Sequence, residues 1–130
     1  MKPINSTEVT APAGHYSHAV ISGNLVFVSG QLPFPLNSKE LPEGIEAQTL
    51  QALKNVEAVL ISAGSSLDNL LNVQIFISDI ALWPAVNQVY SVFLKDAKPA
   101  RTIVPCNTLH YGALIEINAI ASSIAQPNNA

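Results

Sequence analysis

Charged side chains are scarce in this chain of 130 residues, of which only 12% are Asp, Glu, Lys or Arg. That is about half the share found in a typical soluble domain. Six basic residues stand against nine acidic ones, and Arg101 is the only arginine. With 48% hydrophobic residues and a formal net charge of −3, the composition excludes an intrinsically disordered chain. It also argues against a nucleic-acid-binding surface, which needs clustered Lys and Arg.

Long apolar segments and paired cysteines are also missing. No uninterrupted apolar run approaches the roughly 18–20 residues of a transmembrane helix, and residues 1–18 lack the apolar stretch of a secretory signal. Cys106 is the only cysteine, so no disulfide can form within the chain. His15 and His18 have no further ligands at suitable spacing, so no metal site is predicted. We therefore expect a cytoplasmic protein that does not contact membranes.

The length fits one domain over residues 1–130, and so little surface charge suggests that apolar surface is covered by partner subunits. The hydrophobic pattern predicts strands at 16–22, 25–29, 71–79, 101–104 and 113–121. It predicts one helix over 43–64 and a second that begins near Pro84. Gly23-Asn24 separates the first two strands and indicates a hairpin.

Periodicity then predicts which helix faces are buried. The first helix has apolar positions at steps of mostly three and four: Ile45, Leu50, Leu53, Val56, Leu60 and Ala63. The second helix has a shorter apolar stripe: Val86, Val89, Tyr90 and Phe93. The order β-β-α-β-α-β-β predicts a two-layer α+β domain with a mixed sheet and both helices on one face. The uncovered face of the sheet would then need a partner, which again suggests an oligomer.

Arg101 is a candidate for binding a carboxylate. It follows Lys98-Pro99-Ala100 at the start of a predicted strand, and the proline fixes the approach of the chain. A planar guanidinium pairs with a carboxylate through two parallel hydrogen bonds, as lysine cannot. An ordinary surface or ion-pairing role would explain the residue equally well.

Glu116 is a candidate for acid–base chemistry. In the strand over 113–121, Ile115 and Ile117 lie on one face, and Glu116 shares the other face with apolar neighbours and Asn118. A carboxylate within so apolar a strand is either at an exposed edge or retained for a purpose such as proton transfer.

Three further residues are candidates for contacts with a ligand. Gly30 ends the second predicted strand, where glycine often lets another backbone or a ligand approach closely. Tyr16 immediately precedes the first strand. Asn87 lies at the margin of the apolar stripe on the second helix, where a helix-surface or capping hydrogen bond is the simpler explanation.

Six short motifs occur in a fixed order between about residue 14 and residue 124. They are Gly14-His15-Tyr16-Ser17-His18-Ala19, Val28-Ser29-Gly30-Gln31-Leu32-Pro33, the helix segment 46–56 with Ala63-Gly64, Asn87-Gln88-Val89-Tyr90, Pro99-Ala100-Arg101-Thr102 and Ile115-Glu116-Ile117. Each motif alone is common, but six in register are specific. Together they resemble the motifs of the Rid family, also called the YjgF family.

This resemblance implies a chorismate-mutase-like α+β fold assembled as a homotrimer, with three clefts between subunits. It also implies hydrolysis of reactive 2-imino and 2-enamino acids to 2-keto acids and ammonia, without a cofactor. Arg101 falls on the arginine that binds the substrate carboxylate, and Glu116 on the acid that positions or activates water. Tyr16 and Gly30 match other cleft residues, and Ile103 matches a position that contacts the ligand through its backbone.

The chain departs from the family pattern around the predicted cleft. His15 and His18 replace the usual Pro and Gln, and Ile103 stands where many members have Cys or Thr. Cys106 lies five residues after Arg101, and a cysteine at this spacing resembles the family members that handle aminoacrylate in pyrimidine degradation. Three other functions stay open: a module that binds keto acids without turnover, a deaminase for aminomuconate or aminoacrylate from ring catabolism, and RNA cleavage, which the few basic residues disfavour.

Overall fold

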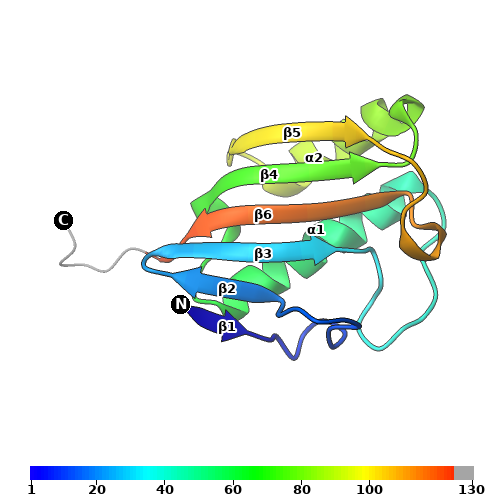
Figure 1. Cartoon of the computed structure of the whole chain (residues 1–130). Helices are drawn as coiled ribbons and strands as arrows, with labels where there is room; N and C mark the ends of the chain where they lie inside the picture. Colours follow the sequence, from blue (N-terminus) through cyan, green and yellow to red (C-terminus); the bar gives the residue numbers. More distant parts are fainter. Residues whose placement is uncertain (125–130) are drawn as a thin grey trace.

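Six strands form one mixed sheet, which two helices cover on one face (Figure 1). The computed structural model describes residues 1–124. Its elements are β1 (Lys2–Ile4), β2 (Ala19–Ser22), β3 (Leu25–Gln31), α1 (Ile45–Ser62), β4 (Leu70–Ile77), α2 (Trp83–Leu94), β5 (Ala100–Pro105) and β6 (Ile115–Ser122). The spatial order is β1-β2-β3-β6-β4-β5, with β4 and β5 parallel and every other pair antiparallel. The predicted two-layer α+β domain is confirmed.

The path of the chain explains why one face of the sheet is left open. β3 and β4 are both antiparallel to β6, which lies between them, so β3 and β4 run in the same direction. α1 connects β3 to β4, and α2 connects β4 to β5. Both connections move across the sheet in the same direction, and right-handed crossovers of that kind place their helices on the same face. No helix within residues 1–124 covers the opposite face (Figure 1).

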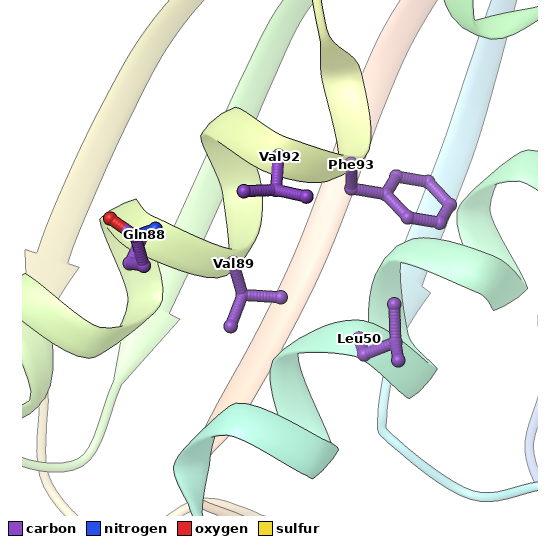
Figure 2. Close-up of a pocket in the computed structure, with 5 residues that line it drawn as sticks. All are labelled: Leu50, Gln88, Val89, Val92 and Phe93. Atoms are coloured by element: carbon purple, nitrogen blue, oxygen red, sulfur yellow. The ribbon is translucent and has the colours of Figure 1, made fainter.

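The buried core lies between the sheet and the helices. In β4, every second side chain points toward the helices and is almost completely buried: Val73, Ile75 and Ile77. Most of the stripe predicted for α1 is buried as well, but Leu50 is 37% exposed. Leu50 lies on the outer side of the helix layer, where it borders a hollow of about 260 Å³ with residues of α2 (Figure 2). On α2 the deeply buried positions are Val86, Tyr90 and Leu94, whereas Val89 and Phe93 are only partly covered.

Pairing within the sheet confirms the predicted hairpin and corrects two other strand predictions. Ser22 pairs with Leu25 around the Gly23-Asn24 turn. The sequence pattern does not predict β1, because three residues including Pro3 carry no alternation; as an edge strand β1 tolerates the proline. Alternation along 71–79 predicts that Leu71 shares the apolar face of Val73, Ile75 and Ile77, but a register shift between Leu70 and Asn72 leaves Leu71 47% exposed.

Neither helix of the described chain is both long and apolar enough to cross a membrane.

Candidate active site

A cleft of about 890 Å³ lies where β3 ends, beside the loop that leads into β2. Three of the predicted site residues, Tyr16, Gly30 and Glu116, line it together. They come from the N-terminal loop, from β3 and from the neighbouring strand β6. The cleft is completed by residues of four segments: Val9, Thr10, Ala11, Ala13, Gly14, His18, Ser29, Gln31, Leu32, Phe34, Ser38, Lys39, Asn55, His110 and Tyr111.

Glu116 lies directly against Gly30. β6 is a central strand, so this carboxylate is held within the sheet and does not lie at an exposed edge. A Cβ atom on Gly30 would be 2.7 Å from Oε2 of Glu116 and 3.0 Å from its Cδ. The close approach predicted at Gly30 is therefore made by the Glu116 side chain. Within residues 1–124 the carboxylate has no hydrogen-bond or ion-pair partner, so its oxygens are free to bind water or a ligand.

Arg101 lies in a second cluster, between β5 and α2. Its Nη1 donates a hydrogen bond of 2.8 Å to Oδ1 of Asn87, and its guanidinium carbon lies 4.8 Å from the ring centroid of Tyr90. Asn87 therefore forms a hydrogen bond with a residue of the sheet. This is not the helix-surface or capping hydrogen bond that the sequence suggests. No carboxylate is among the partners of this guanidinium in the described part of the chain. Ile103, on the same face of β5, packs against the core.

The two clusters lie on opposite faces of the sheet. Arg101 is in register with Val73, which points toward the helices. Glu116 is in register with Phe76, and three positions along a strand reverse the side-chain direction. β4 also separates β5 from β6, which adds about 10 Å between them. Arg101 and Glu116 of one chain therefore cannot contact the same small molecule.

His18 holds the N-terminal loop that borders the cleft. Its buried ring accepts a hydrogen bond from the Ser6 N–H at Nδ1 (2.9 Å) and donates from Nε2 to the Thr10 carbonyl oxygen (2.9 Å); the partners assign the neutral tautomer. Its backbone N–H donates to Oδ1 of Asn5 at 3.0 Å. The departure from the family pattern at this position is thus a structural one, and both ring nitrogens are occupied. No group of three or more potential metal ligands occurs within residues 1–124.

We expect His18→Ala to lower the free energy of unfolding by about 2 kcal/mol, because it leaves the buried Ser6 N–H and the Thr10 carbonyl oxygen without partners. Urea unfolding followed by circular dichroism measures the change. His15→Ala is the matched control, since His15 is exposed and should change stability by less than about 0.5 kcal/mol. Equal unfolding free energies for the two variants would contradict the assigned role of His18.

Two polar residues of α1 that sequence reasoning left out hold the other loops at the cleft. Gln48 is buried and accepts a hydrogen bond of 2.8 Å from the Leu114 N–H, just before β6. Asn55 donates to the carbonyl oxygens of Leu32 (3.1 Å) and Phe34 (2.9 Å), just after β3. Polar residues at positions on the buried face of the helix are the signal that could have found them, since buried polar groups need partners.

Comparison with known proteins decides the family. The family model described as Endoribonuclease L-PSP matches residues 7–123. A RutC family protein of Pyrococcus horikoshii is 38% identical over 123 residues, which cover 93% of this chain and 98% of that protein. The chain belongs to the Rid (YjgF) family.

Two solved structures show the same fold. The YjgF gene product of E. coli has a TM-score of 0.90 at 32% identity, covering 94% of this chain and 98% of that one. E. coli TdcF, solved with bound serine, has a TM-score of 0.91 at 30% identity, covering 95% and 100%. Family membership and the Rid fold, both predicted from the motifs, are confirmed, whereas the roles of Tyr16, Gly30, Asn87, Arg101, Ile103 and Glu116 stay predictions.

Proposed function

We propose that this Rid-family protein hydrolyses reactive 2-imino and 2-enamino acids to 2-keto acids and ammonia, in the cytoplasm and without a cofactor. The observation that carries the proposal is the pair of unsatisfied charges. Arg101 is anchored by Asn87 but has no carboxylate partner, and Glu116 lines a cleft with free oxygens. A guanidinium of this kind suits the carboxylate of an imino acid, and a free carboxylate suits proton transfer to and from water.

The proposal includes a homotrimer with an active site between neighbouring subunits. Because Arg101 and Glu116 lie on opposite faces of one sheet, a second copy has to supply one of them. The uncovered sheet face carries apolar side chains such as Phe27, which is among the exposed large hydrophobic residues. Contact between copies would bury such residues and, in a closed cyclic arrangement, would make every site equivalent.

The chemistry needs one water and one group that exchanges protons with it. A 2-enamino acid first becomes the imine by gaining a proton at C3 and losing one from nitrogen. The water oxygen then bonds to C2 of the imine while Glu116 accepts one water proton and passes it to the nitrogen, which gives a carbinolamine with a hydroxyl and an amino group on C2. Glu116 next accepts the hydroxyl proton as the C2–N bond breaks and delivers that proton to the leaving nitrogen. Both water hydrogens end on the nitrogen, so the products are ammonia and the keto acid.

The ligand seen in one family member supports the substrate class. E. coli TdcF was solved with bound serine, an amino acid whose dehydration product is 2-aminoacrylate. Tyr16 and Gly30 would contact the ligand from the Glu116 side of the cleft. On the other side, β5 is an edge strand whose outward backbone groups have no strand partner within residues 1–124, which leaves the main chain at Ile103 able to bind a ligand.

A coupled assay tests the proposed function. Serine dehydratase generates 2-aminoacrylate, and the rate at which keto acid appears is compared with and without the protein. We expect clear acceleration by the wild type and a loss of about 100-fold or more in Glu116→Gln, which cannot exchange the proton. Binding of pyruvate by calorimetry without any acceleration would instead indicate a keto-acid-binding module. A substrate panel that includes aminomuconate tests the remaining deaminase alternative, in which the substrate is aminomuconate or aminoacrylate from ring catabolism.

Gly30→Ala tests the packing against Glu116. A methyl group there would have to displace the carboxylate, since the space 2.7 Å away is occupied by Oε2. We expect about a 100-fold loss of activity with little change in stability, because a displacement of about 1 Å is enough to disrupt catalytic geometry. Gly14→Ala is the control, because Gly14 also lines the cleft but its Cβ would lie 3.5 Å from Tyr16. Full activity in Gly30→Ala would count against Glu116 as the proton-exchanging group.

The family model's description as an endoribonuclease raises RNA cleavage as a function for this chain. The charges do not favour it, because the chain has six basic residues against nine acidic ones and one lysine lines the cleft. RNA binding rests on contacts between cations and phosphates, and its affinity falls as salt rises. Salt-dependent RNA binding at micromolar protein would overturn this view.

A further inference from the structure

The guanidinium of Arg101 lies over an aromatic ring. Its carbon atom is 4.8 Å from the ring centroid of Tyr90, within the range of a cation–π interaction. The same guanidinium donates from Nη1 to Oδ1 of Asn87 at 2.8 Å. Asn87 and Tyr90 are three residues apart on α2 and therefore lie on the same side of the helix. One helix turn thus supplies both contacts.

The Tyr90 ring is a fixed support. The side chain is only 7% exposed and belongs to the hydrophobic core. Because it is packed on α2 against the sheet, its ring has little freedom to move away when a ligand arrives. Arg101 itself is partly buried at the start of an edge strand, where an unsupported guanidinium would sample many rotamers.

The Tyr90 hydroxyl does not account for the buried position of this side chain. It is buried and has no hydrogen-bond partner within residues 1–124. Burial raises the pKa of this hydroxyl, and the Arg101 cation opposes the rise, so the group stays neutral. A buried hydroxyl without a partner is unfavourable, and phenylalanine would fill the core without that cost. The contribution of Tyr90 therefore comes from the ring.

We infer that Tyr90 is a positioning residue: its ring face and the Asn87 oxygen together hold the Arg101 guanidinium so that the remaining N–H groups are available to a substrate carboxylate. This inference rests on the proposed function, because it assigns a purpose to the orientation of the carboxylate-binding arginine. One edge of the guanidinium is used by Asn87, one face by Tyr90, and no acidic side chain of residues 1–124 competes for the rest.

The inference predicts that losing the ring weakens carboxylate binding without removing the charge. A pre-oriented guanidinium loses less freedom when it binds a ligand. We expect Tyr90→Leu to raise the Kd for pyruvate about 10-fold and to raise KM more than it lowers kcat. Tyr90→Phe keeps the ring and removes only the unpartnered hydroxyl, so it should bind pyruvate like the wild type and be at least as stable.

Nuclear magnetic resonance provides a test that does not depend on activity. Because the chain contains one arginine, the Nε–H group of Arg101 gives a single side-chain arginine signal. In the wild type and in Tyr90→Phe we expect ring-current displacement of the Arg101 side-chain proton signals and contacts between those protons and the aromatic protons. In Tyr90→Leu the displacement should disappear and the signal should show greater mobility. Pyruvate titrated into each sample gives Kd from the same signal.

Each outcome decides between two possibilities. Unchanged Arg101 signals and an unchanged Kd in Tyr90→Leu would overturn the inference, as would wild-type spectra without contacts between the Tyr90 ring and Arg101. Should Tyr90→Leu fail to fold, Tyr90→Met replaces it, because methionine adapts to the space left in a core. If the wild type shows the ring effect but neither binds pyruvate nor accelerates imine hydrolysis, the proposed function fails while the ring contact stands.

Discussion

Replacing Arg101 with alanine should lower kcat/KM for 2-aminoacrylate by about 30- to 5000-fold, since losing one partner of a hydrogen-bonded charge pair costs about 2–5 kcal/mol. The substrate's only permanent charge is its carboxylate, and Arg101 is the only arginine in the chain. Arg101→Lys keeps the charge but lacks the planar pair of donors, and its single ammonium cannot reproduce the bond to Asn87 and the carboxylate geometry together. We expect it to recover only part of the loss.

Lys98→Ala is the matched control for this experiment. It removes one positive charge three residues before Arg101, without touching Asn87 or Tyr90. The coupled serine dehydratase assay measures activity, and urea unfolding confirms that each variant is folded. If folded Arg101→Ala released keto acid at the wild-type rate, the arginine would be structural and the proposed substrate binding would be wrong. A similar loss in Lys98→Ala would point to a general charge effect instead.

Mixing two inactive variants should restore activity. Arg101→Ala subunits retain Glu116, and Glu116→Gln subunits retain Arg101. If each site takes one residue from each of two neighbouring subunits, random exchange at equal amounts returns about a quarter of the wild-type activity. Arg101 is intact in one half of the subunits and Glu116 in the other half, so about one site in four has both residues intact. This follows from the register of β4 with β5 and β6, which places the two side chains on opposite faces.

The mixing experiment separates three arrangements. Subunits are exchanged by mild denaturation and refolding together, and each variant refolded alone is the control. Activity that stays at the level of the separate variants would show that both residues act within one chain or that one of them is not involved. Subunits that carry both substitutions, Arg101→Ala and Glu116→Gln, should lower the activity of wild-type subunits mixed with them and should restore none. Light scattering on the same samples measures whether the assembly is a trimer, and a monomer at micromolar concentration would exclude the shared site.

Local sequence patterns were sufficient for both helices, for every strand except β1, and for the family. Periodicity placed both helices, and the Gly-Asn pair placed the hairpin, because these signals depend on neighbours within a few residues. The motifs containing Tyr16, Gly30, Arg101 and Glu116 were recognisable for the same reason. The scarcity of charge leaves Arg101 as the one candidate guanidinium, since the sequence has no second arginine.

Sequence patterns mislead where segments far apart in the chain decide a residue's surroundings. Leu71 fits an alternating strand in sequence, but a register shift between β4 and β6 exposes it. His18 does line the cleft, but only its partners Ser6 and Thr10 show that its ring holds the N-terminal loop. Tyr90 resembles an ordinary core residue until Arg101 is found beside its ring.

The sequence by itself determined both helices, every strand except β1, the α+β class, the family and the two charged residues that the proposed reaction needs. Only the tertiary structure decided how those two residues are arranged. β6, the last strand within residues 1–124, enters between β3 and β4, and its register with β4 sends Glu116 to the open face while Arg101 faces the helices. Strand order and register arise from pairing between segments far apart in sequence, which local periodicity does not encode.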